Sequence, residues 1–355
     1  MGFETEQHPN AAYGDLPANP ENMPLDAEQK ITQIGAEIQE LQESRDENGN
    51  ELYAVTNPIE LTLKIYALRN TPRQDRLLVT DFDKALTDHT SKPCFAALGI
   101  PPNDCTPEEQ AAITKYKTLT SLEYPTHRGA INGLKNTLPT DTTLAEYNQQ
   151  QFSPGNVVSD AINSLYDVLI DTGILAAHNL FTEAPELIEK LVQNGPLRLR
   201  AGIRNLLTIF GEVVVVSGGI TEIIEGILQK EQIAVNAIIA NPISQPPNIY
   251  NYVTPTNKPE RLRQYIQEQG MYAAEGYPLH PSQATVLLGD DPNDMCIDRE
   301  IQVETTLKIL LHTIPHNGQV REAYPGYPDY DIMIHKTEDL ARIAHLLDPD
   351  IAAVL

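Results

Sequence analysis

The stretch LLVTDFDKALT, residues 77–87, decides the fold. Its apolar start predicts a buried strand, and two aspartates one residue apart follow directly. Because alternate side chains of an extended chain share a face, Asp81 and Asp83 are expected on one side at the carboxyl end of this strand. Ligands of open α/β sheets bind at that end. Taken alone, however, such a pair is more typical of a solvated acidic turn.

A second stretch of the same kind begins at Val213. The apolar run 213–216 predicts a buried strand, Ser217-Gly218-Gly219 predicts a turn, and the pattern of 220–229 predicts a helix. A hydroxyl and glycines at a strand-to-helix turn leave backbone N–H groups free to hold a phosphate at the helix N-terminus.

Two later stretches add a cation and more acids. Lys258 stands at the start of a helical pattern, where a lone lysine is usually a surface residue. The strand predicted at 285–288 ends in GDDPND, residues 289–294, whose acids are spaced to reach one metal ion. Each stretch is weak evidence alone, but the order of all four is informative.

Together, DFDKALT, SGG, NK and GDDPND resemble the four motifs of the haloacid dehalogenase superfamily of phosphohydrolases. Within it the chain looks most like the cytosolic pyrimidine 5′-nucleotidases. The similarity covers about residues 57–347 and is thin between the first two motifs. The closer likeness rests on Asn57-Pro58, LRAGIRNLL at 199–207, NK at 257–258, LLGDDPND at 287–294 and YDIMIHKTEDL at 330–340.

The resemblance implies a role for each matching residue. Asp81 would attack phosphorus to form an aspartyl-phosphate, and Asp83 would protonate the departing oxygen and then activate water. Ser217 and the N–H of Gly218 would hold phosphoryl oxygens. Lys258 would supply a positive charge and restrain the nucleophile.

The implied cofactor is Mg²⁺, which prefers hard oxygen ligands. We expect it on the carboxylates of Asp81 and Asp290 and the backbone carbonyl of Asp83, with Asp294 as an indirect ligand. Asp291 is less suited to touch the metal. The acids also resemble a calcium loop, but their spacing does not match the EF-hand pattern.

The first motif departs from the family pattern at its fifth position. The family usually has Thr or Val there, whereas this chain has Ala85. A missing hydroxyl removes one supporting hydrogen bond, worth about 1 kcal/mol. Thr87 lies two residues further along, so it is not a direct replacement. A catalytically weak relative therefore remains an open alternative.

The order of elements predicts an α/β fold with a doubly wound, parallel, Rossmann-like sheet. Residues 51–95 and 195–355 would form this core. The resemblance implies that the mainly helical insertion 96–194 is a cap, which would select substrate and exclude water. Residues 1–50 would be an N-terminal extension. Beyond the first two strands, we expect strands at 235–240, 285–288, 307–311 and 331–335.

The cap carries the residues that would recognise a base. By resemblance, Glu123 would hydrogen bond a base edge, with Tyr116 or Tyr124 available for stacking. An equally good interpretation makes Glu123 a surface acid beside the turn at Pro125.

The N-terminal extension is expected to contain one amphipathic helix at about residues 26–44. The prediction rests on the helical spacing of Ile31, Ile34, Ile38 and Leu41. The apolar stripe of this helix can pack on the chain's own core or on a second copy, so a homo-oligomer through this helix is left open. The preceding residues 1–25 are polar and rich in proline, which favours a loosely attached arm.

Charge narrows the choice of partners. The chain carries a formal net charge of −24, which disfavours nucleic-acid polymers and anionic membranes. It shows neither a long apolar run nor a secretory signal pattern, so we expect a cytoplasmic protein without a membrane span.

The sequence therefore predicts a magnesium-dependent phosphomonoesterase, a 5′-nucleotidase-like hydrolase that acts on nucleoside 5′-monophosphates. One alternative is a phosphotransferase of the same fold, which would pass the phosphoryl group to another nucleoside. Another is a weak relative that serves as a binding or regulatory module. A nucleotide-sugar transferase also uses an Asp-x-Asp pair for metal, but it does not explain the other motifs.

Overall fold

The computed structural model describes the N-terminal helix and the core of the chain. The predicted cap, 96–194, lies outside the described residues, and the domain boundaries stay a prediction. The described residues are 25–88, 198–242, 253, 258–268, 284–290, 294–295, 297, 305–312 and 330–351.

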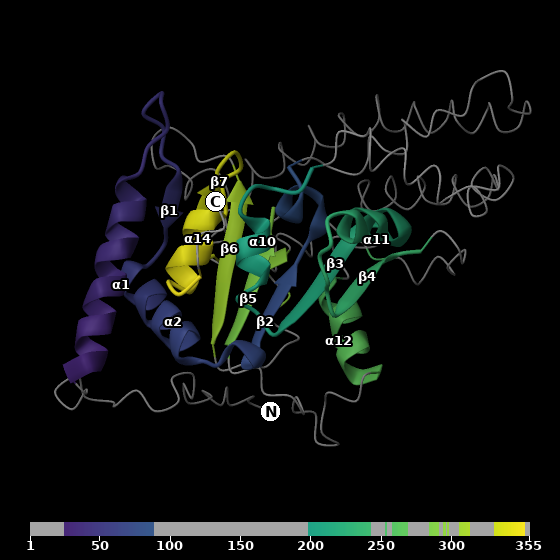
Figure 1. Ribbon diagram of the computed structural model, residues 1–355, viewed down its shortest axis with the longest axis horizontal. Coiled ribbons are helices and arrows are strands. Elements are labelled where there is room, and N and C mark those ends of the chain that lie inside the picture. The colour runs from purple at the N-terminus through teal and green to yellow at the C-terminus, as the bar shows by residue number, and fades with distance from the viewer. Residues whose placement is uncertain are drawn as a thin grey trace, which may run out of the picture.

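A seven-stranded sheet forms the centre of the described structure (Figure 1). The strands lie in the order β1-β7-β6-β5-β2-β3-β4. Every neighbouring pair is parallel except β1 and β7. The predicted α/β fold with a mostly parallel sheet is confirmed. The strands are β1 (Tyr53–Val55), β2 (Arg76–Thr80), β3 (Glu212–Ile220), β4 (Ala237–Asn241), β5 (Ala284–Gly289), β6 (Thr306–His312) and β7 (Ile332–His335).

Successive strands are added to the sheet first on one side of β2 and then on the other. The chain runs outward from β2 through β3 to β4, and then returns to the other side of β2 with β5, β6 and β7. In parallel pairing, Thr80 at the end of β2 lies beside Val215 of β3 and Leu288 of β5. The residues that follow these three strands therefore come to one edge, at a switch point of the kind where α/β sheets bind ligands.

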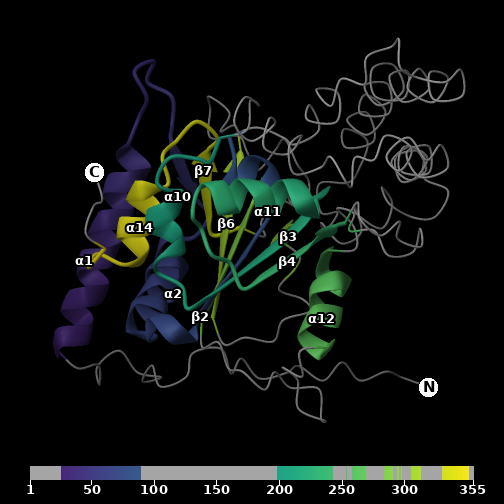
Figure 2. The ribbon, with the colours of Figure 1, turned by 45° about the vertical axis from the view of Figure 1, so that its right-hand side comes forward.

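Helices cover both faces of the sheet (Figures 1 and 2). Alternate strand residues serve the two faces: Leu78 packs in the larger core cluster, whereas Leu77 and Val79 pack with α12 in the smaller one. Strands buried on both faces explain the continuous apolar runs of the sequence. The helices are α1 (Leu25–Glu43), α2 (Pro58–Asn70), α10 (Ile203–Leu207), α11 (Thr221–Lys230), α12 (Lys258–Glu268) and α14 (Ala341–Leu347), with short turns η2 (Arg73–Asp75) and η3 (Phe82–Leu86).

The start of α2 follows directly from the local sequence. The side chain of Asn57 accepts a hydrogen bond from the backbone N–H of Glu60, and Pro58 takes the first helical position. The first turn lacks internal acceptors for its N–H groups, so an Asn cap followed by proline fixes where the helix begins.

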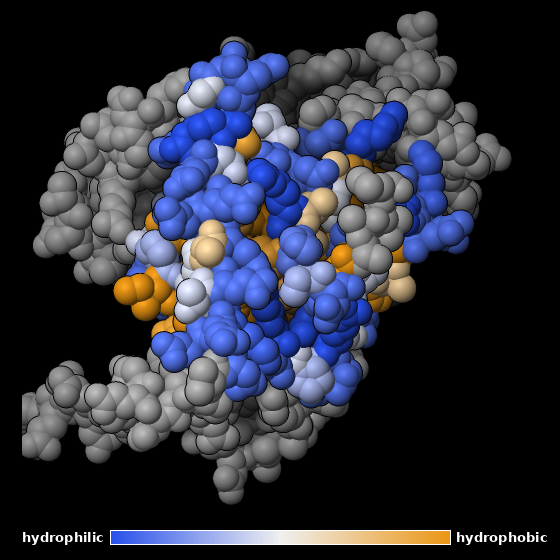
Figure 3. All heavy atoms as spheres, turned by 60° about the vertical axis from the view of Figure 1, so that its left-hand side comes forward, coloured by the Kyte–Doolittle hydropathy of each residue, from blue (hydrophilic) through white to orange (hydrophobic). Residues whose placement is uncertain are grey.

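Helix α1 docks on the chain's own core. Ile34, Ile38 and Leu41 of its apolar stripe are buried in the larger cluster. Glu37 of the same helix pairs with Arg69 of α2. The side of the molecule turned forward in Figure 3, which carries α1, is mainly hydrophilic over its described residues. Three of the four residues of the predicted stripe are therefore covered within the chain, and a homo-oligomer through α1 stays a prediction.

Two local features differ from the sequence expectation. Strand β1, which pairs with β7, is missing from the predicted elements. Ser217-Gly218-Gly219 was expected as a turn, but these residues continue β3 in extended form, and α11 begins only at Thr221. The register of β3 against β4 shifts between Val216 and Ile220, so these residues form an irregular part of the strand in place of the expected turn.

No helix among the described residues is long and apolar enough to cross a membrane.

We expect Ile38→Ala to lower the free energy of unfolding by about 2–5 kcal/mol, because it removes a buried side chain between α1 and the core. Urea unfolding followed by circular dichroism would measure the change. Gln39→Ala on the exposed face of α1 is the control and should change stability by less than about 0.5 kcal/mol. An Ile38→Ala protein as stable as the control would show that α1 does not dock here.

Candidate active site

Asp81 is fixed at the carboxyl end of the central strand. All five residues of β2 are buried, and the backbone N–H of Asp81 continues the ladder by donating to the carbonyl of Leu288 at 3.0 Å. The Asp81 side chain is itself buried. The first motif therefore places the carboxylate of Asp81 at the switch point of the sheet.

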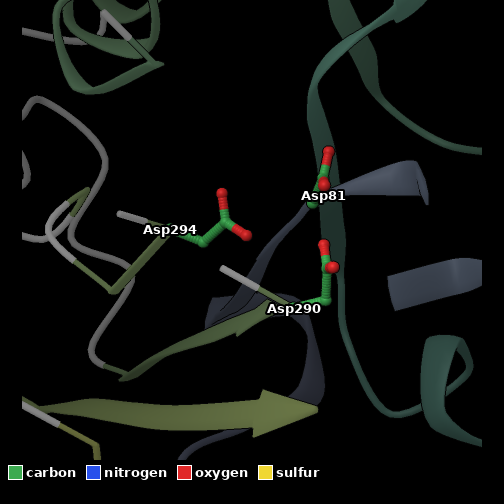
Figure 4. A group of neighbouring side chains, drawn as sticks. All are labelled: Asp81, Asp290 and Asp294. Atoms are coloured by element: carbon green, nitrogen blue, oxygen red, sulfur yellow. The ribbon is translucent and has the colours of Figure 1, made fainter. Parts of the chain in front are cut away.

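Two acids of the last motif meet Asp81 there. Asp290 directly follows β5, and Asp294 lies four residues further on. Carboxylate oxygens of Asp81, Asp290 and Asp294 all lie within 4.8 Å of one another (Figure 4). A Cβ atom at Gly289 would lie 2.3 Å from the Cβ of Asp294, so the absence of a side chain at this glycine lets Asp294 approach.

Lys258 joins two of these acids. It is the first residue of α12 and only 4% exposed. Its Nζ lies 3.0 Å from Oδ1 of Asp81 and 2.7 Å from Oδ1 of Asp294. Burial alone would lower the pKa of Lys258, but the charges of Asp294 and Asp81 outweigh it and raise this pKa above its ordinary value. The lysine therefore remains a cation at neutral pH.

Ser217 and Gly218 lie in β3, beside the end of β2. Ser217 comes two residues after Val215, the partner of Thr80, and its buried hydroxyl oxygen accepts the N–H of Gly219 at 3.1 Å. The carbonyl of Gly218 accepts a hydrogen bond from the side chain of Asn241 at 3.0 Å. A serine and two backbone amides are thus held at the same edge as Asp81.

The rest of the first motif forms the short kinked turn η3, in which Asp83 and Lys84 have non-helical backbone angles. Asp83 is half-buried in this turn, and Lys84 has a positive φ of 60°. The buried hydroxyl of Thr87 accepts the N–H of Lys84 and donates to the carbonyl of Phe82, both at 3.1 Å. Ala85, at the departing fifth position, is fully buried. The loop hydroxyl therefore comes from Thr87.

Arg200 acts as a clamp on this turn, because its buried side chain hydrogen bonds to several backbone carbonyls. Its guanidinium donates to the carbonyls of Lys84 at 2.7 Å, Ala85 at 3.3 Å and Thr87 at 3.4 Å, and also to that of Lys336. Burial lowers the pKa of Arg200 from its ordinary value. Sequence reasoning gave Arg200 no role, although an arginine inside the apolar stretch that precedes α10 was a usable signal.

Lys84 is the second residue that sequence reasoning missed. Its Nζ lies 3.0 Å from Oδ2 of Asp290, so a second ammonium reaches the acidic group. The signal was its place directly after Asp83. The remaining predicted residues Glu123, Tyr116, Tyr124 and Asp291 lie outside the described residues.

The acidic group fits a magnesium ion. It offers three carboxylates, and Mg²⁺ favours such hard oxygen ligands. Oδ1 of Asp81 is buried and, although Lys258 contacts it as an ion pair, it has no hydrogen-bond donor among the described residues. Asp294 belongs to this group, and its expected part as an indirect ligand stays a prediction. The carboxylate of Asp83 is not one of the three, and its predicted carbonyl contact stays a prediction.

Neither a family model nor a curated protein sequence matches the chain. Among solved structures it is similar to cytosolic 5′-nucleotidase IIIB bound to cytidine, with a TM-score of 0.54 and 14% identity over 90% of this chain and 96% of that one. The chain has the haloacid dehalogenase fold. The resemblance drawn from the four motifs is thus confirmed for the fold.

Two phosphoserine phosphatase structures are also similar to the chain, more weakly. The substrate-bound complex has a TM-score of 0.37, with 16% identity over 75% of this chain and 95% of that chain. The phospho-aspartyl intermediate analogue has a TM-score of 0.36, with 16% identity over 75% of this chain and 96% of that chain.

We expect Arg200→Met to lower the free energy of unfolding by about 2–4 kcal/mol, because it leaves buried carbonyl groups of the turn without their donor. Urea unfolding would measure the loss. The matched control is Arg204→Met, which breaks the exposed pair with Glu231 and should cost about 0–1 kcal/mol. Equal effects of the two substitutions would contradict the clamp.

Proposed function

We propose that the chain is a phosphomonoesterase whose nucleophile is Asp81. The supporting observation is the buried ammonium of Lys258 between Asp81 and Asp294, with Asp290 in the same group. A carboxylate that attacks phosphorus must be ionised and must tolerate an approaching anion. The adjacent buried cation supports this role, because it pairs with the carboxylate of Asp81 and offsets the charge of the phosphate.

Hydrolysis then takes two steps at one carboxylate. An oxygen of Asp81 forms a bond to phosphorus while the ester oxygen leaves with a proton from Asp83. A water molecule next attacks the aspartyl-phosphate, Asp83 takes its proton, and inorganic phosphate leaves with Asp81 restored. Ser217 and the N–H of Gly218 would hold the phosphoryl oxygens, and Lys258 would restrain Asp81 throughout.

The carboxylates of Asp81, Asp290 and Asp294 would hold Mg²⁺, together with the backbone carbonyl of Asp83. When bound, such an ion supplies positive charge to the phosphoryl oxygens and orients them. Lys258 already neutralises part of the charge of Asp81 and Asp294, so the group is less repulsive to a phosphate ester than three bare carboxylates.

We propose nucleoside 5′-monophosphates as the substrates and the cytoplasm as the location. The likeness of the motifs to the pyrimidine nucleotidases supports this choice, as does the overall fold shared with a nucleotidase that binds cytidine. Glu123 would recognise the base, with Tyr116 or Tyr124 stacked on it. These three residues belong to the proposed cap.

We expect Asp81→Asn to lower phosphatase activity by at least about 1,000-fold, because an amide cannot form the acyl phosphate. The assay measures inorganic phosphate released from a panel of nucleoside monophosphates and other phosphate esters in the presence of Mg²⁺. Removal of Mg²⁺ with a chelator should also abolish release, and its return should restore it.

Asp26→Asn, the same change at an exposed position of α1, is the control and should leave activity intact. Full activity in Asp81→Asn would end the assignment of the nucleophile. If the unmodified chain released phosphate from none of the esters, a binding or regulatory module would become the better reading. Analysis of products with an added nucleoside separates hydrolysis from phosphoryl transfer.

A further inference from the structure

Lys84 is joined to the acidic group by an ion pair that spans most of the chain. Its Nζ lies 3.0 Å from Oδ2 of Asp290, 206 residues away in the sequence. The Lys84 side chain is 53% exposed and that of Asp290 is 18% exposed. The pair therefore lies at the solvent side of the group, whereas Lys258 occupies its buried side.

The backbone of Lys84 is held in place independently of this ion pair. Its positive φ of 60° is unfavourable for a residue with a Cβ atom. The conformation is secured because its N–H donates to the hydroxyl of Thr87 and its carbonyl accepts from Arg200. Both partners are buried. The ammonium is therefore tethered near Asp290 even when it does not contact this carboxylate.

Each of the three acids contacts the ammonium of a lysine. Lys258 contacts Asp81 and Asp294, and Lys84 contacts Asp290. A divalent ion bound at Oδ2 of Asp290 would lie close to the ammonium of Lys84, so the two positive charges would repel each other and oppose metal binding. Lys258 is buried and has little room to move, but the half-exposed Lys84 can turn into solvent.

We propose that Lys84 is a built-in competitor of divalent cations at Asp290, and that it weakens their binding to this chain. The inference rests on the metal site of the proposed function. An exposed ion pair is a weak interaction, so removal of the ammonium should tighten metal binding by only about 2- to 5-fold. The site therefore fills at a higher concentration of Mg²⁺ than the three carboxylates would otherwise require.

The test is the affinity of the full chain for Mn²⁺ without substrate, measured from the free Mn²⁺ signal in electron paramagnetic resonance. Lys84→Met should bind Mn²⁺ about 2- to 5-fold more tightly, whereas Lys84→Arg, which keeps the charge, should stay close to the unmodified chain. Lys30→Met on α1 makes the same change of net charge far from the site and should have no effect. Circular dichroism checks that each variant is folded.

Each result decides the inference. Tighter binding in Lys84→Met alone supports it, including the case in which only this variant binds Mn²⁺ measurably. Unchanged or weaker binding overturns it, and the proposed function survives if phosphatase activity still depends on Asp81. If no variant binds Mn²⁺, both the inference and the proposed metal site are wrong.

Discussion

The buried ammonium of Lys258 is the interaction on which the site depends. Removal of a charge from water is costly unless an opposite charge meets it, and here one cation serves the carboxylates of Asp81 and Asp294. Burial of each of these three charged groups depends on the others, since loss of Lys258 would leave the carboxylates of Asp81 and Asp294 buried side by side without a cation. The positions of these three side chains therefore reflect a balance of charge.

Sheet topology is what brings the three groups together. Asp81 ends β2, the last motif follows β5, and the two strands are parallel neighbours, so their carboxyl ends coincide. The hydrogen bond from Asp81 to Leu288 locks the two ends to each other. Gly289 then lets Asp294 fold back over the strand end. Residues that are far apart in the sequence meet because a doubly wound sheet has one switch point.

Much of this arrangement is visible in the sequence, because it depends on local rules. Apolar runs reveal strands that are buried on both faces, and Asn57 with Pro58 reveals where α2 begins. The roles of Arg200 and Lys84 are not visible in the same way. Arg200 binds backbone carbonyls, which leave no side-chain pattern, and Lys84 finds Asp290 only after the sheet has formed. The docking partner of α1 depends likewise on tertiary packing.

The surroundings of Ala85 show that a single hydrogen bond is a poor measure of how well the first motif is supported. The absent hydroxyl at this position suggested a weakened first motif, at a cost of about 1 kcal/mol. In the folded chain, Thr87 bridges two backbone groups of the turn and Arg200 holds three of its carbonyls. The turn therefore has several supports that do not involve residue 85. Ala85 consequently does not distinguish an enzyme from a binding module, and that choice rests on whether Asp81 beside Lys258 can attack phosphorus.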